Sequence, residues 1–345
     1  MGKLKAVVTA FIDKKNLNLL KEYCDITVTG WAKTGVKLNE EEMIEALEDA
    51  DILLVGYEKV SEYVIKNSPK LKLIGCTRGN PINVDSKFAK SSRIPVIYTP
   101  ARNANSAAEY TMGMILSEVR HIARAFYSLK TGLYVGPAAQ NVYELPEEDD
   151  VVWNLDQDSP YKKFRGYELN GRTLGLVGFG NIATRISKMA KAFEMNVLAF
   201  DPYCSESTAK EYGVKLVPLD TLLKKADFIS LHCKVTDETK GLIGEKELAM
   251  MKPTAYLINT ARAAIINQRA LVKALTEHKI AGAALDVYWY EPIPANHPLL
   301  SLDNVTLTPH IAGASYDVPS RHSEMIVKDT IKWIKGEKPE RVFEV

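Results

Sequence analysis

Three charged or titratable side chains follow three short apolar runs late in the sequence. Arg262, Asp286 and His310 each come directly after such a run, and Glu291 lies five residues beyond Asp286. Groups of these kinds hold charged ligands or exchange protons near neutral pH. Taken singly, they would read as a surface arginine, a strand-end acid and a histidine that caps a helix. Parallel strands present their carboxyl ends at one ligand-binding edge, so three successive strand ends predict a catalytic constellation.

A dinucleotide-binding pattern precedes these residues. Residues 174–183 read LGLVGFGNIA, an apolar strand that leads into G-x-G-x-x-A. Gly178 would permit the tight turn, Gly180 would let the backbone approach a pyrophosphate, and Ala183 would allow close helix–strand packing. Asp201 follows Gly180 by 21 residues, near the spacing of an acid that binds the adenosine ribose and disfavours a 2′-phosphate. The pattern favours NAD over NADP; a turn without a ligand and a methyltransferase site are the alternatives.

The elements that would position these residues alternate between β-branched runs and helical stretches, and no internal repeat interrupts them. The runs form two series, at 6–9, 51–55, 71–74 and 95–98, and then at 174–177, 197–200, 227–231, 255–258, 281–285 and 305–308. Strand–helix alternation is typical of parallel sheets with helices on both faces. The sequence therefore predicts an α/β fold with two sheets, the second of at least six strands.

Two amphipathic helices are also predicted. In residues 106–130 the apolar side chains recur at steps of three or four, as one stripe of Met112, Ile115, Val119, Ile122, Phe126 and Leu129. This spacing predicts a single long helix with a continuous apolar face. A final helix is expected over 324–335, with Ile326, Ile331 and Ile334 on one side.

An acidic stretch separates the first of these helices from the dinucleotide pattern. Residues 131–160 contain seven Asp or Glu and no Lys or Arg. Charge runs are usually solvated surface loops. Tyr134, Tyr143 and Trp153 would instead give the stretch something to bury, as expected of a segment that covers a site or contacts a second subunit.

Composition excludes several classes of function. The 345 residues include 44 Lys or Arg and 43 Asp or Glu, so the chain lacks the basic field that nucleic-acid binding requires. Its apolar runs are far shorter than a membrane span of about 20 residues, and neither a signal peptide nor a myristoylation pattern is evident. Four scattered cysteines and six histidines match no metal spacing. We expect a cytoplasmic protein without a metal, with its cysteines reduced and buried.

The motifs together resemble the NAD-dependent D-isomer-specific 2-hydroxyacid dehydrogenases, a family that includes D-3-phosphoglycerate dehydrogenase. The resemblance covers nearly the whole chain and is strongest at residues 178–182, 231–243, 259–262, 282–287, 291–292 and 308–313. It implies a Rossmann-type, doubly wound NAD-binding domain at 104–310. It also implies a discontinuous, flavodoxin-like α/β substrate domain made of 1–103 and 311–345. Family members are usually homodimers or homotetramers, built partly through the long helix that begins here near Asn105.

The same resemblance implies roles for single residues. Arg262 would pair with the carboxylate of the substrate and polarise its 2-oxo group, His310 would be the general acid and base, and Glu291 would orient the imidazole and stabilise its protonated form. Asp286 would lie near the nicotinamide carboxamide. The loop with Arg78, Gly79 and Asn80 would hold the substrate carboxylate through backbone amides. Cofactor contacts are expected at Gly178, Gly180, Asn181, Ile182, Asp201, Thr260, Ala261, Arg262, Asp286, His310, Ala312 and Gly313.

Two departures from the family pattern concern the substrate. Ala263 and Ala264 follow Arg262 where the family commonly has a glycine, and residues 56–58 lack the arginines that help phosphoglycerate dehydrogenases hold a phosphate. Arg78 is either a substitute anion contact or a surface residue. The expected substrate is a 2-hydroxy or 2-oxo acid, with phosphoglycerate, hydroxypyruvate and a sugar-derived acid all open.

Two rival functions fit the same fold. One is a corepressor-like binding protein that senses NAD, since fold does not fix function; the chain has almost no tail of the kind such proteins add. The other is a different reaction on the same scaffold. Formate oxidation would pair the histidine with a glutamine, against which Glu291 argues, whereas phosphite oxidation is harder to exclude.

Overall fold

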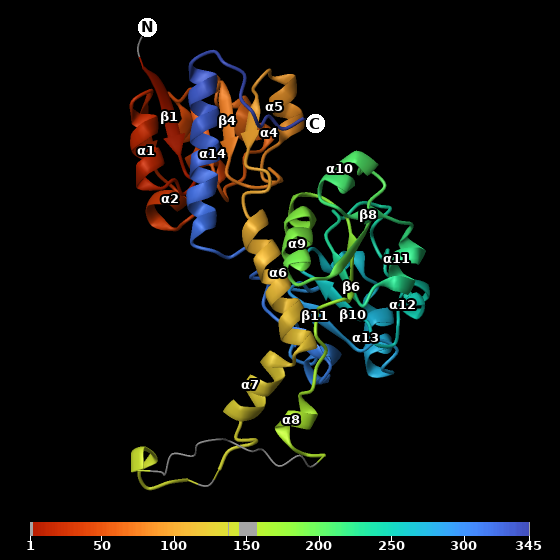
Figure 1. Ribbon diagram of the computed structural model, residues 1–345. Coiled ribbons are helices and arrows are strands. Elements are labelled where there is room, and N and C mark those ends of the chain that lie inside the picture. Colours follow the sequence, from red (N-terminus) through yellow and green to blue (C-terminus); the bar gives the residue numbers. More distant parts are fainter. Residues whose placement is uncertain (1–2, 137, 145–156, 345) are drawn as a thin grey trace. The chain divides into compact units, whose positions relative to one another are not determined.

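The computed structural model describes residues 3–136, 138–144 and 157–344. The chain divides into two compact units, Met1–Asn103 with Gly313–Val345, and Ala104–Ala312 (Figure 1). Among the described residues, no helix is both long and apolar enough to span a bilayer.

The first unit is built on a parallel sheet that has five strands within its described residues. The strands are β1 (Leu4–Val8), β2 (Cys24–Val28), β3 (Ile52–Val55), β4 (Leu73–Cys76) and β5 (Val96–Tyr98). Their order is β2-β1-β3-β4-β5, the flavodoxin-like order, in which ligands bind where β1 and β3 separate. The helices are α1 (Lys14–Lys21), α2 (Trp31–Thr34), α3 (Glu40–Leu47), α4 (Glu62–Lys66), α5 (Ser86–Ser91) and α14 (Asp317–Ile334).

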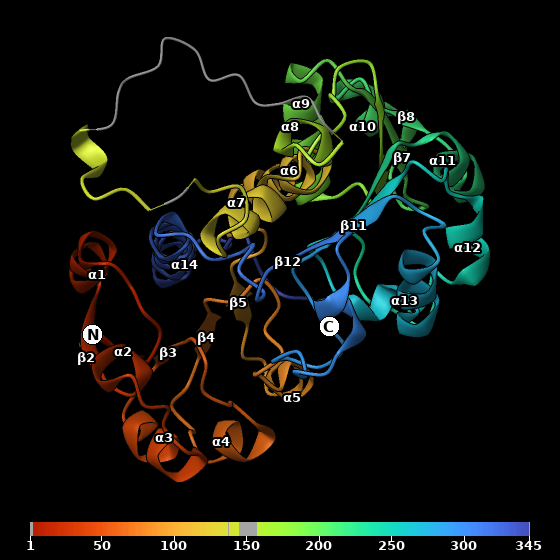
Figure 2. The same cartoon turned by 90° about the horizontal axis from the view of Figure 1, so that it is seen from below.

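Helices cover both faces of this sheet (Figure 2). Apolar residues of α3, α4 and α5 pack on one face, where Met43, Leu47 and Val64 are fully buried. Leu20 of α1 and Ile326 of α14 pack on the other. Local signals set the helix starts; α3 begins at a capping box, in which the Asn39 side chain accepts from the Glu42 amide at 2.9 Å.

Strand β2 was missed by the sequence analysis, although the other four strands of this sheet lie at the predicted runs. It is an edge strand in which Asp25 and Thr27 are exposed, so it lacks a continuous apolar run. The predicted final helix is confirmed, but α14 begins seven residues earlier than expected, at Asp317.

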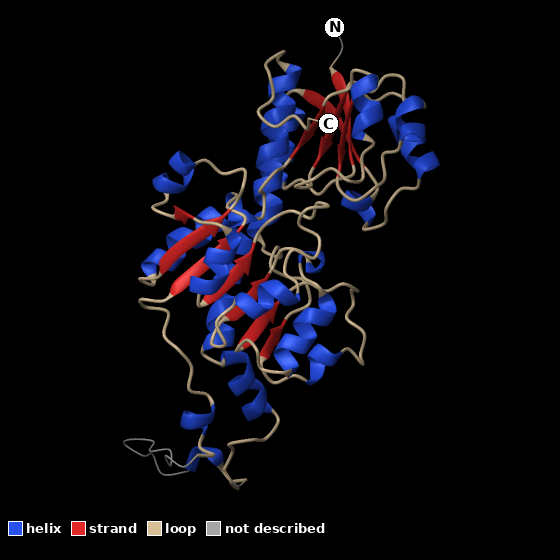
Figure 3. Ribbon diagram, turned by 90° about the vertical axis from the view of Figure 1, so that its right-hand side faces the viewer, coloured by secondary structure: helices blue, strands red, loops and turns tan. Residues whose placement is uncertain are grey.

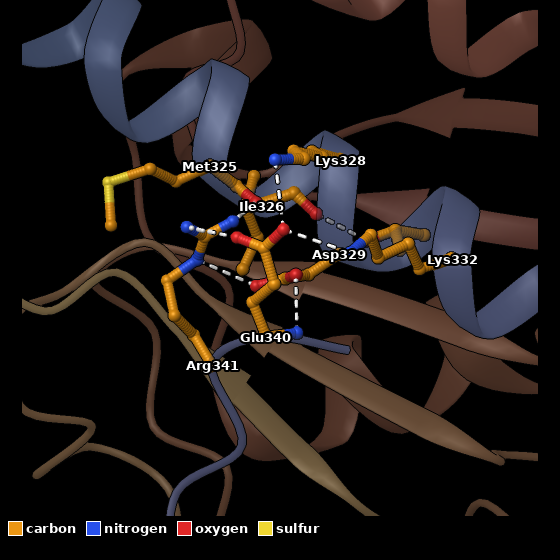
Figure 4. Close-up of polar contacts among 8 residues, drawn as sticks. Met325, Ile326, Lys328, Asp329, Lys332, Glu340 and Arg341 are labelled. Atoms are coloured by element: carbon orange, nitrogen blue, oxygen red, sulfur yellow. Dashed lines mark hydrogen bonds and ion pairs between the residues drawn. The ribbon is translucent and has the colours of Figure 1, made fainter. Parts of the chain in front are cut away.

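The C-terminal segment is tied to α14 by an ionic network (Figure 4). Asp329 is fully buried and accepts from Nε of Arg341 at 2.7 Å and from the Glu340 amide at 2.9 Å. Lys332 and Lys328 each approach Glu340 to 2.9 Å, and their hydrogen bonds lower the pKa of Glu340 to about 2. The following backbone bonds to β5, so residues far apart in sequence close the edge of the sheet.

The second unit contains a parallel sheet with seven strands among its described residues (Figure 3). They are β6 (Thr173–Val177), β7 (Asn196–Phe200), β8 (Lys215–Leu216), β9 (Phe228–Leu231), β10 (Tyr256–Asn259), β11 (Gly282–Leu285) and β12 (Val305–Leu307). The order β12-β11-β10-β9-β6-β7-β8 is the doubly wound order of a Rossmann fold with one added strand. All six predicted runs are strands, and β8, with two residues, was not predicted.

Helices cover both faces of this sheet as well. They are α6 (Ala104–Val119), α7 (Ile122–Lys130), α8 (Pro160–Lys163), α9 (Asn181–Ala192), α10 (Glu206–Glu211), α11 (Leu219–Lys225), α12 (Glu245–Met250) and α13 (Gln268–Thr276). Short 3-10 turns occur at Val142–Glu144, Ala263–Ile265 and Pro298–Ser301. Apolar residues of α6, α9 and α10 share one core, and those of α11, α12 and α13 share the other.

The single long helix predicted over 106–130 is wrong. Helix α6 ends at Val119 and α7 begins at Ile122, with His121 between them in the left-handed region at φ 53°. Gly166 lies against the end of α6: a Cβ added to Gly166 would be 1.9 Å from the carbonyl oxygen of Val119. The first half of the apolar stripe is buried, whereas Ile122, Phe126 and Leu129 are exposed. Periodicity identified the apolar face correctly but could not show what covers it.

The acidic stretch is described in part. Tyr134 makes an edge contact with Phe164, the ring centroids being 5.7 Å apart, and the side chain of Tyr143 is 94% exposed. Trp153 and most of the acidic residues lie outside the described residues.

The expectation that all four cysteines are buried is half right. Cys24 and Cys76 are buried, and burial raises the pKa of each thiol to about 11. Cys204 and Cys233 are partly exposed.

Candidate active site

The sheet order brings the predicted catalytic residues to one edge of the second unit. Strands β10, β11 and β12 are neighbours and parallel. Arg262 follows β10, Glu291 follows β11 and His310 follows β12, each beyond the carboxyl end of its strand. The doubly wound fold therefore brings to one edge three residues that are spread over 48 positions of the sequence, from 262 to 310.

His310 and Glu291 form a hydrogen-bonded pair. Nδ1 of His310 lies 2.8 Å from Oε2 of Glu291, and Oε1 of Glu291 accepts from the Tyr288 amide at 3.0 Å. A carboxylate only accepts, so Nδ1 carries the proton and Nε2 is the ring nitrogen left for a ligand. The two side chains are 42% and 39% exposed, so the pair is accessible.

The surroundings favour the ionised form of Glu291. Partial burial opposes ionisation, but the hydrogen bond from His310, the Tyr288 amide and the positive charge of Arg262 outweigh it. These contacts hold the pKa of Glu291 below its ordinary value. Glu291 therefore remains a carboxylate at neutral pH, beside an imidazole that it can stabilise in the protonated form.

Asp286 anchors the loop that carries His310. Its side chain is fully buried, and Oδ1 accepts from the Thr308 hydroxyl at 2.7 Å and from the Ile311 amide at 2.9 Å. Oδ2 accepts from the Ala312 amide at 2.8 Å. These bonds hold the chain on both sides of His310, which has a left-handed φ of 57°. The predicted contact of Asp286 with a nicotinamide carboxamide stays a prediction.

Arg262 is exposed, and its loop is held by a residue that the sequence analysis did not single out. Asn259 is 1% exposed; its Nδ2 donates to the Arg262 carbonyl at 2.9 Å, and its Oδ1 accepts from the Ala261 amide at 3.0 Å. The hydroxyl of Thr260 lies 2.7 Å from that of Thr111 on α6. Asn259 is the first residue of the 259–262 motif, but the sequence does not show its side-chain hydrogen bonds. We call these two bonds, to the Ala261 amide and the Arg262 carbonyl, the Asn259 clamp.

The backbone after Arg262 adopts a conformation that does not require a glycine. Ala263 and Ala264 form the 3-10 turn Ala263–Ile265, and neither has a positive φ. No left-handed conformation is required here, so alanine is tolerated.

The residues at the switch point of the second sheet fit a dinucleotide. Gly178 has a φ of 90°, and a Cβ there would come within 2.6 Å of the Cys233 amide, so the turn requires glycine. Apart from the adjoining residues of its own segment, no described residue has a heavy atom within 4 Å of a Cβ position on Gly180. Gly180 is also the N-cap of α9 and makes no side-chain cap. The open backbone and the free amides of the helix start would suit a pyrophosphate.

The other predicted cofactor residues surround this turn or follow neighbouring strands. Asn181 and Ile182 form the first turn of α9 and are exposed and half-buried, respectively. Asp201 follows β7, where its Oδ2 accepts from the Phe179 amide at 2.7 Å and its Oδ1 from the Tyr203 amide at 2.8 Å. The loop thus fixes the carboxylate beside the glycine turn. The other residues predicted to contact the cofactor, Thr260, Ala261 and Ala312, lie in the loops after β10 and β12.

The last four predicted site residues belong to the first unit. Gly313 begins the second segment of that unit. A Cβ added to Gly313 would lie 2.8 Å from the side-chain nitrogen Nδ2 of Asn103. The loop of Arg78, Gly79 and Asn80 follows β4; Arg78 is half-buried, whereas Gly79 and Asn80 are exposed. The carbonyl of Arg78 accepts from the Thr99 amide at 3.1 Å.

Other features of the second unit bear on its chemistry. A mostly apolar cavity of about 400 Å³ adjoins the His310–Glu291 pair, and Tyr288, Leu300 and Leu307 line it. Burial lowers the pKa of His232 to about 3, so this histidine is neutral and is no rival to His310 as an acid. Within the part of the chain that the structure describes, no three His, Cys, Asp or Glu side chains are grouped to hold a metal.

Known proteins are similar to this chain in sequence and in fold. The family model for the D-isomer specific 2-hydroxyacid dehydrogenase, NAD binding domain, matches residues 112–312. Over 342 residues the chain is 38% identical to the D-3-phosphoglycerate dehydrogenase of Methanocaldococcus jannaschii. The match covers 98% of this chain but 59% of that protein. Over 350 residues it is 37% identical to the glyoxylate reductase of Thermofilum pendens, covering 98% and 94% of the two chains.

The structural comparison agrees. The D-lactate dehydrogenase of Lactobacillus jensenii, solved with NAD+, is 25% identical and matches with a TM-score of 0.78, covering 99% of this chain and all of that one. The family model spans more than half of the sequence, and it ends two residues after His310. The chain therefore belongs to the D-isomer specific 2-hydroxyacid dehydrogenase family and carries the family's NAD-binding domain.

Proposed function

We propose that this chain is an NAD-dependent 2-hydroxyacid dehydrogenase in which His310, Glu291 and Arg262 act on the substrate. The observation that carries the proposal is the hydrogen bond between His310 and Glu291, 2.8 Å long, at the same sheet edge as Arg262. Family membership supports the reaction class. The nicotinamide supplies or accepts the hydride when the cofactor is bound.

Each residue has a defined task in the reduction of a 2-oxo acid. Nε2 of His310 gives a proton to the carbonyl oxygen as that oxygen gains charge, and takes it back in the oxidation. Glu291 holds the ring through Nδ1 and offsets the charge of the imidazolium. Arg262 presents a planar guanidinium that pairs with the substrate carboxylate and polarises the 2-oxo group.

The cofactor site follows from the glycine turn. The backbone at Gly178 and Gly180 and the first amides of α9, at Asn181 and Ile182, would hold the pyrophosphate, and Asp201 would accept from the ribose hydroxyls. Asp286 stays assigned to the nicotinamide carboxamide, and Thr260, Ala261, Ala312 and Gly313 to the cofactor, by family resemblance alone. The carboxylate of Asp201 would repel a 2′-phosphate, which favours NAD.

The substrate is a small 2-hydroxy or 2-oxo acid. The names of the relatives, phosphoglycerate dehydrogenase, glyoxylate reductase and lactate dehydrogenase, span phosphorylated and unphosphorylated acids. We assign substrate binding to the first unit, where backbone amides of Arg78, Gly79 and Asn80 would hold the carboxylate.

We also propose that the protein is a homodimer or homotetramer. Ile122, Phe126, Tyr127 and Leu129 of α7 are all more than half exposed, and Leu133 continues this apolar surface. Adjacent large side chains of this kind mark an interface. Sedimentation velocity on the wild type and on Phe126→Asp would test this, with a shift to a smaller species expected in the variant.

One assay tests the reaction. NADH oxidation is followed with glyoxylate, hydroxypyruvate, phosphohydroxypyruvate, pyruvate and longer sugar-derived acids, with His310→Ala as the control. Turnover that the variant loses supports the proposal. If the wild type binds NADH but reduces none of these acids, the proposal is wrong and an NAD-sensing protein becomes the better account.

A further inference from the structure

A hydrogen bond ties together two loops at the carboxyl edge of the seven-stranded sheet. The Tyr203 hydroxyl, in the loop after β7, donates to Oε2 of Glu238, in the loop after β9, at 3.2 Å. Strand β6 lies between β7 and β9 and leads into the glycine turn. A Cβ on Gly178 would lie 2.6 Å from the amide nitrogen of Cys233, so the loop after β9 packs directly on that turn. The Tyr203–Glu238 bridge therefore spans the part of the sheet edge where the dinucleotide site is proposed.

Tyr203 connects two carboxylates. Its amide donates to Oδ1 of Asp201 at 2.8 Å, whereas its hydroxyl donates to Glu238. Oδ2 of Asp201 accepts from the Phe179 amide at 2.7 Å, which fixes this carboxylate beside the glycine turn. One tyrosine thus sets how far Glu238 lies from Asp201. The Tyr203 side chain is 84% exposed, so a ligand can reach the bridge from solvent.

The loop that carries Glu238 is itself well ordered. Oγ1 of Thr239 accepts from the Thr236 amide at 2.8 Å and donates to the Lys234 carbonyl at 2.6 Å. The Lys240 amide donates to the Thr236 carbonyl at 3.0 Å. These bonds close a tight turn around Glu238 and hold its backbone. The bridge to Tyr203 then sets the direction of its side chain.

This end of the site is acidic. Across residues 3–136, 138–144 and 157–344, no ion pair includes Asp201 or Glu238. The pKa of the Tyr203 hydroxyl is raised, first by its hydrogen bond to Glu238 and further by the charges of Glu238 and Asp201. Although Lys234 adjoins Cys233 in sequence, the pKa of the Cys233 thiol is also raised, by burial and by the charge of Asp201. The two carboxylates therefore dominate the local potential.

Such a potential opposes a second phosphate on the adenosine. A phosphate monoester carries a charge of about −1.5 to −2 at pH 7, and a 2′-phosphate would bring this charge to the ribose. Both oxygens of Asp201 already accept amide hydrogen bonds, which offset part of its charge. Glu238 accepts only the Tyr203 hydroxyl among the described residues, so its charge is less compensated. Like charges without a cation between them discriminate against the wrong ligand.

We propose that Glu238 is a second determinant of cofactor choice. Positioned by Tyr203, it acts together with Asp201 to exclude a 2′-phosphate from the adenosine end of the cofactor site. The inference rests on the cofactor site proposed above and extends it to the loop after β9. It requires no contact outside the second unit.

The test measures nucleotide binding and needs no turnover. The discrimination is the ratio of Kd for NADPH to Kd for NADH, both from fluorescence titration. Adenosine 2′,5′-bisphosphate and adenosine 5′-monophosphate, in competition with NADH, isolate the adenosine end. In Glu238→Gln both ratios should fall about 3- to 10-fold through tighter binding of the 2′-phosphorylated member, because one repulsive charge is lost. Kd for NADH should stay within about twofold of the wild type, since the 2′-hydroxyl carries no charge.

Further variants separate charge from position. Glu238→Gln keeps an acceptor for the Tyr203 hydroxyl, whereas Tyr203→Phe keeps the ring and frees the carboxylate. Tyr203→Phe should lower the ratio by a smaller factor and leave Kd for NADH unchanged. Asp201→Asn should lower it further, and the double variant with Glu238→Gln should show the product of the two effects. Glu211→Gln, at an exposed position of α10, is the matched control and should leave the ratio unchanged.

Failure of this inference differs from failure of the proposed function. A ratio that falls in Asp201→Asn but stays unchanged in Glu238→Gln would overturn the role of Glu238. Equal weakening of NADH and NADPH in Tyr203→Phe would also overturn it, because the bridge would then only support the loop. A ratio that Asp201→Asn leaves unchanged would mean that the proposed cofactor site is wrong. Failure to reduce any 2-oxo acid would refute the dehydrogenase and leave these binding results standing.

Discussion

The two sheets of this protein present very different carboxyl edges. At the edge of the seven-stranded sheet, acidic groups are matched: Glu291 bonds to His310, and Asp286 receives three hydrogen bonds from the loop that carries His310. At the edge of the five-stranded sheet, Lys37 and Arg78 lie by an exposed ring without ion pairs within the described residues. Similar architecture thus positions a hydrogen-bonded acid–base pair at one edge and two cations without ion pairs at the other.

The difference indicates a division of work. A proton-transfer group must hold one geometry before the substrate arrives, so its hydrogen bonds are made within the protein. A cation that binds an anionic ligand must leave its charge for that ligand, because an internal carboxylate would compete with it. We therefore expect substitutions at the edge of the seven-stranded sheet to affect turnover most.

Loss of the proton donor should have the largest effect. His310→Ala removes the proposed general acid, and general acid–base catalysis contributes about 10²- to 10⁴-fold. We expect kcat for reduction of the best acid to fall by about 10³-fold while NADH binding, followed by fluorescence titration, changes little. His278→Asn is the matched control, since it removes an exposed imidazole on a left-handed residue that asparagine tolerates. A comparable loss in the control would contradict the assignment.

Glu291→Gln should have the next largest effect and should change the pH profile. The pKa of Glu291 lies below its ordinary value because His310, Tyr288 and Arg262 favour the carboxylate over the cost of burial. The wild-type interaction is therefore present above that pKa and lost only as the pH falls through it. Glutamine keeps the shape but removes the charge that stabilises the imidazolium.

Reduction needs a proton from His310, and glutamine no longer offsets the charge of the imidazolium, so kcat in Glu291→Gln should fall about tenfold at neutral pH and the loss should grow as the pH rises. Initial rates between pH 5 and 9 measure this pH dependence. An unshifted profile with a uniformly lower rate would mean that Glu291 only orients the ring.

These groups show how far the sequence alone could go. Most of the second sheet was predictable because strands such as β6, β9 and β10 are mostly apolar and buried on both faces. The strand-end positions of Arg262, Glu291 and His310 then followed from the parallel topology. Strand β2 was not predictable in this way, because its exposed Asp25 and Thr27 interrupt the apolar run at the sheet edge.

Long-range side-chain contacts were beyond the sequence. Nothing in the pattern of residues 31–37 indicates that Trp31 and Lys37 approach Tyr57, since those contacts depend on how loops after different strands fold over the edge. The break between α6 and α7 was hidden for a related reason. Apolar spacing continues through residues 120–121, whereas the left-handed turn at His121 depends on packing against another segment.

The Asn259 clamp offers a smaller perturbation of the matched edge. Asn259→Ala removes the bonds to the Ala261 amide and the Arg262 carbonyl, so Arg262 should lose its position and kcat/KM should fall about tenfold. A double-mutant cycle with Arg262→Ala checks the route of the effect. If Asn259 acts through Arg262, its replacement should cost little once Arg262 is absent. Additive losses would show that Asn259 has a merely structural role.

The smallest effect on turnover is expected from a buried carboxyl group away from both edges. Glu118 of α6 is 1% exposed and its Oε2 accepts from the Thr306 hydroxyl at 2.6 Å. In the first unit, the buried Asp329 is paired with Arg341 at 2.7 Å. Glu118 has no such partner among the described residues, and burial raises its pKa to about 7, although Thr306 and Arg124 oppose the shift. In the interiors of the two units the contrast is reversed. The buried carboxyl group of the first unit has an ion-pair partner, whereas that of the second has none among the described residues.

A raised pKa makes stability depend on pH in a defined direction. Between pH 4.5 and 7 the unfolded chain releases a proton that folded Glu118 retains, so stability from this group is lost as the pH rises. Glu118→Gln keeps an acceptor for Thr306 without the charge and should be the more stable protein at pH 8.5 by about 1–2 kcal/mol. The thermal midpoint of Glu118→Gln should exceed that of the wild type by a few degrees more at pH 8.5 than at pH 5.5. Parallel midpoints at the two pH values would mean that Glu118 is ionised throughout and that its charge is compensated within the fold, as that of Asp329 is.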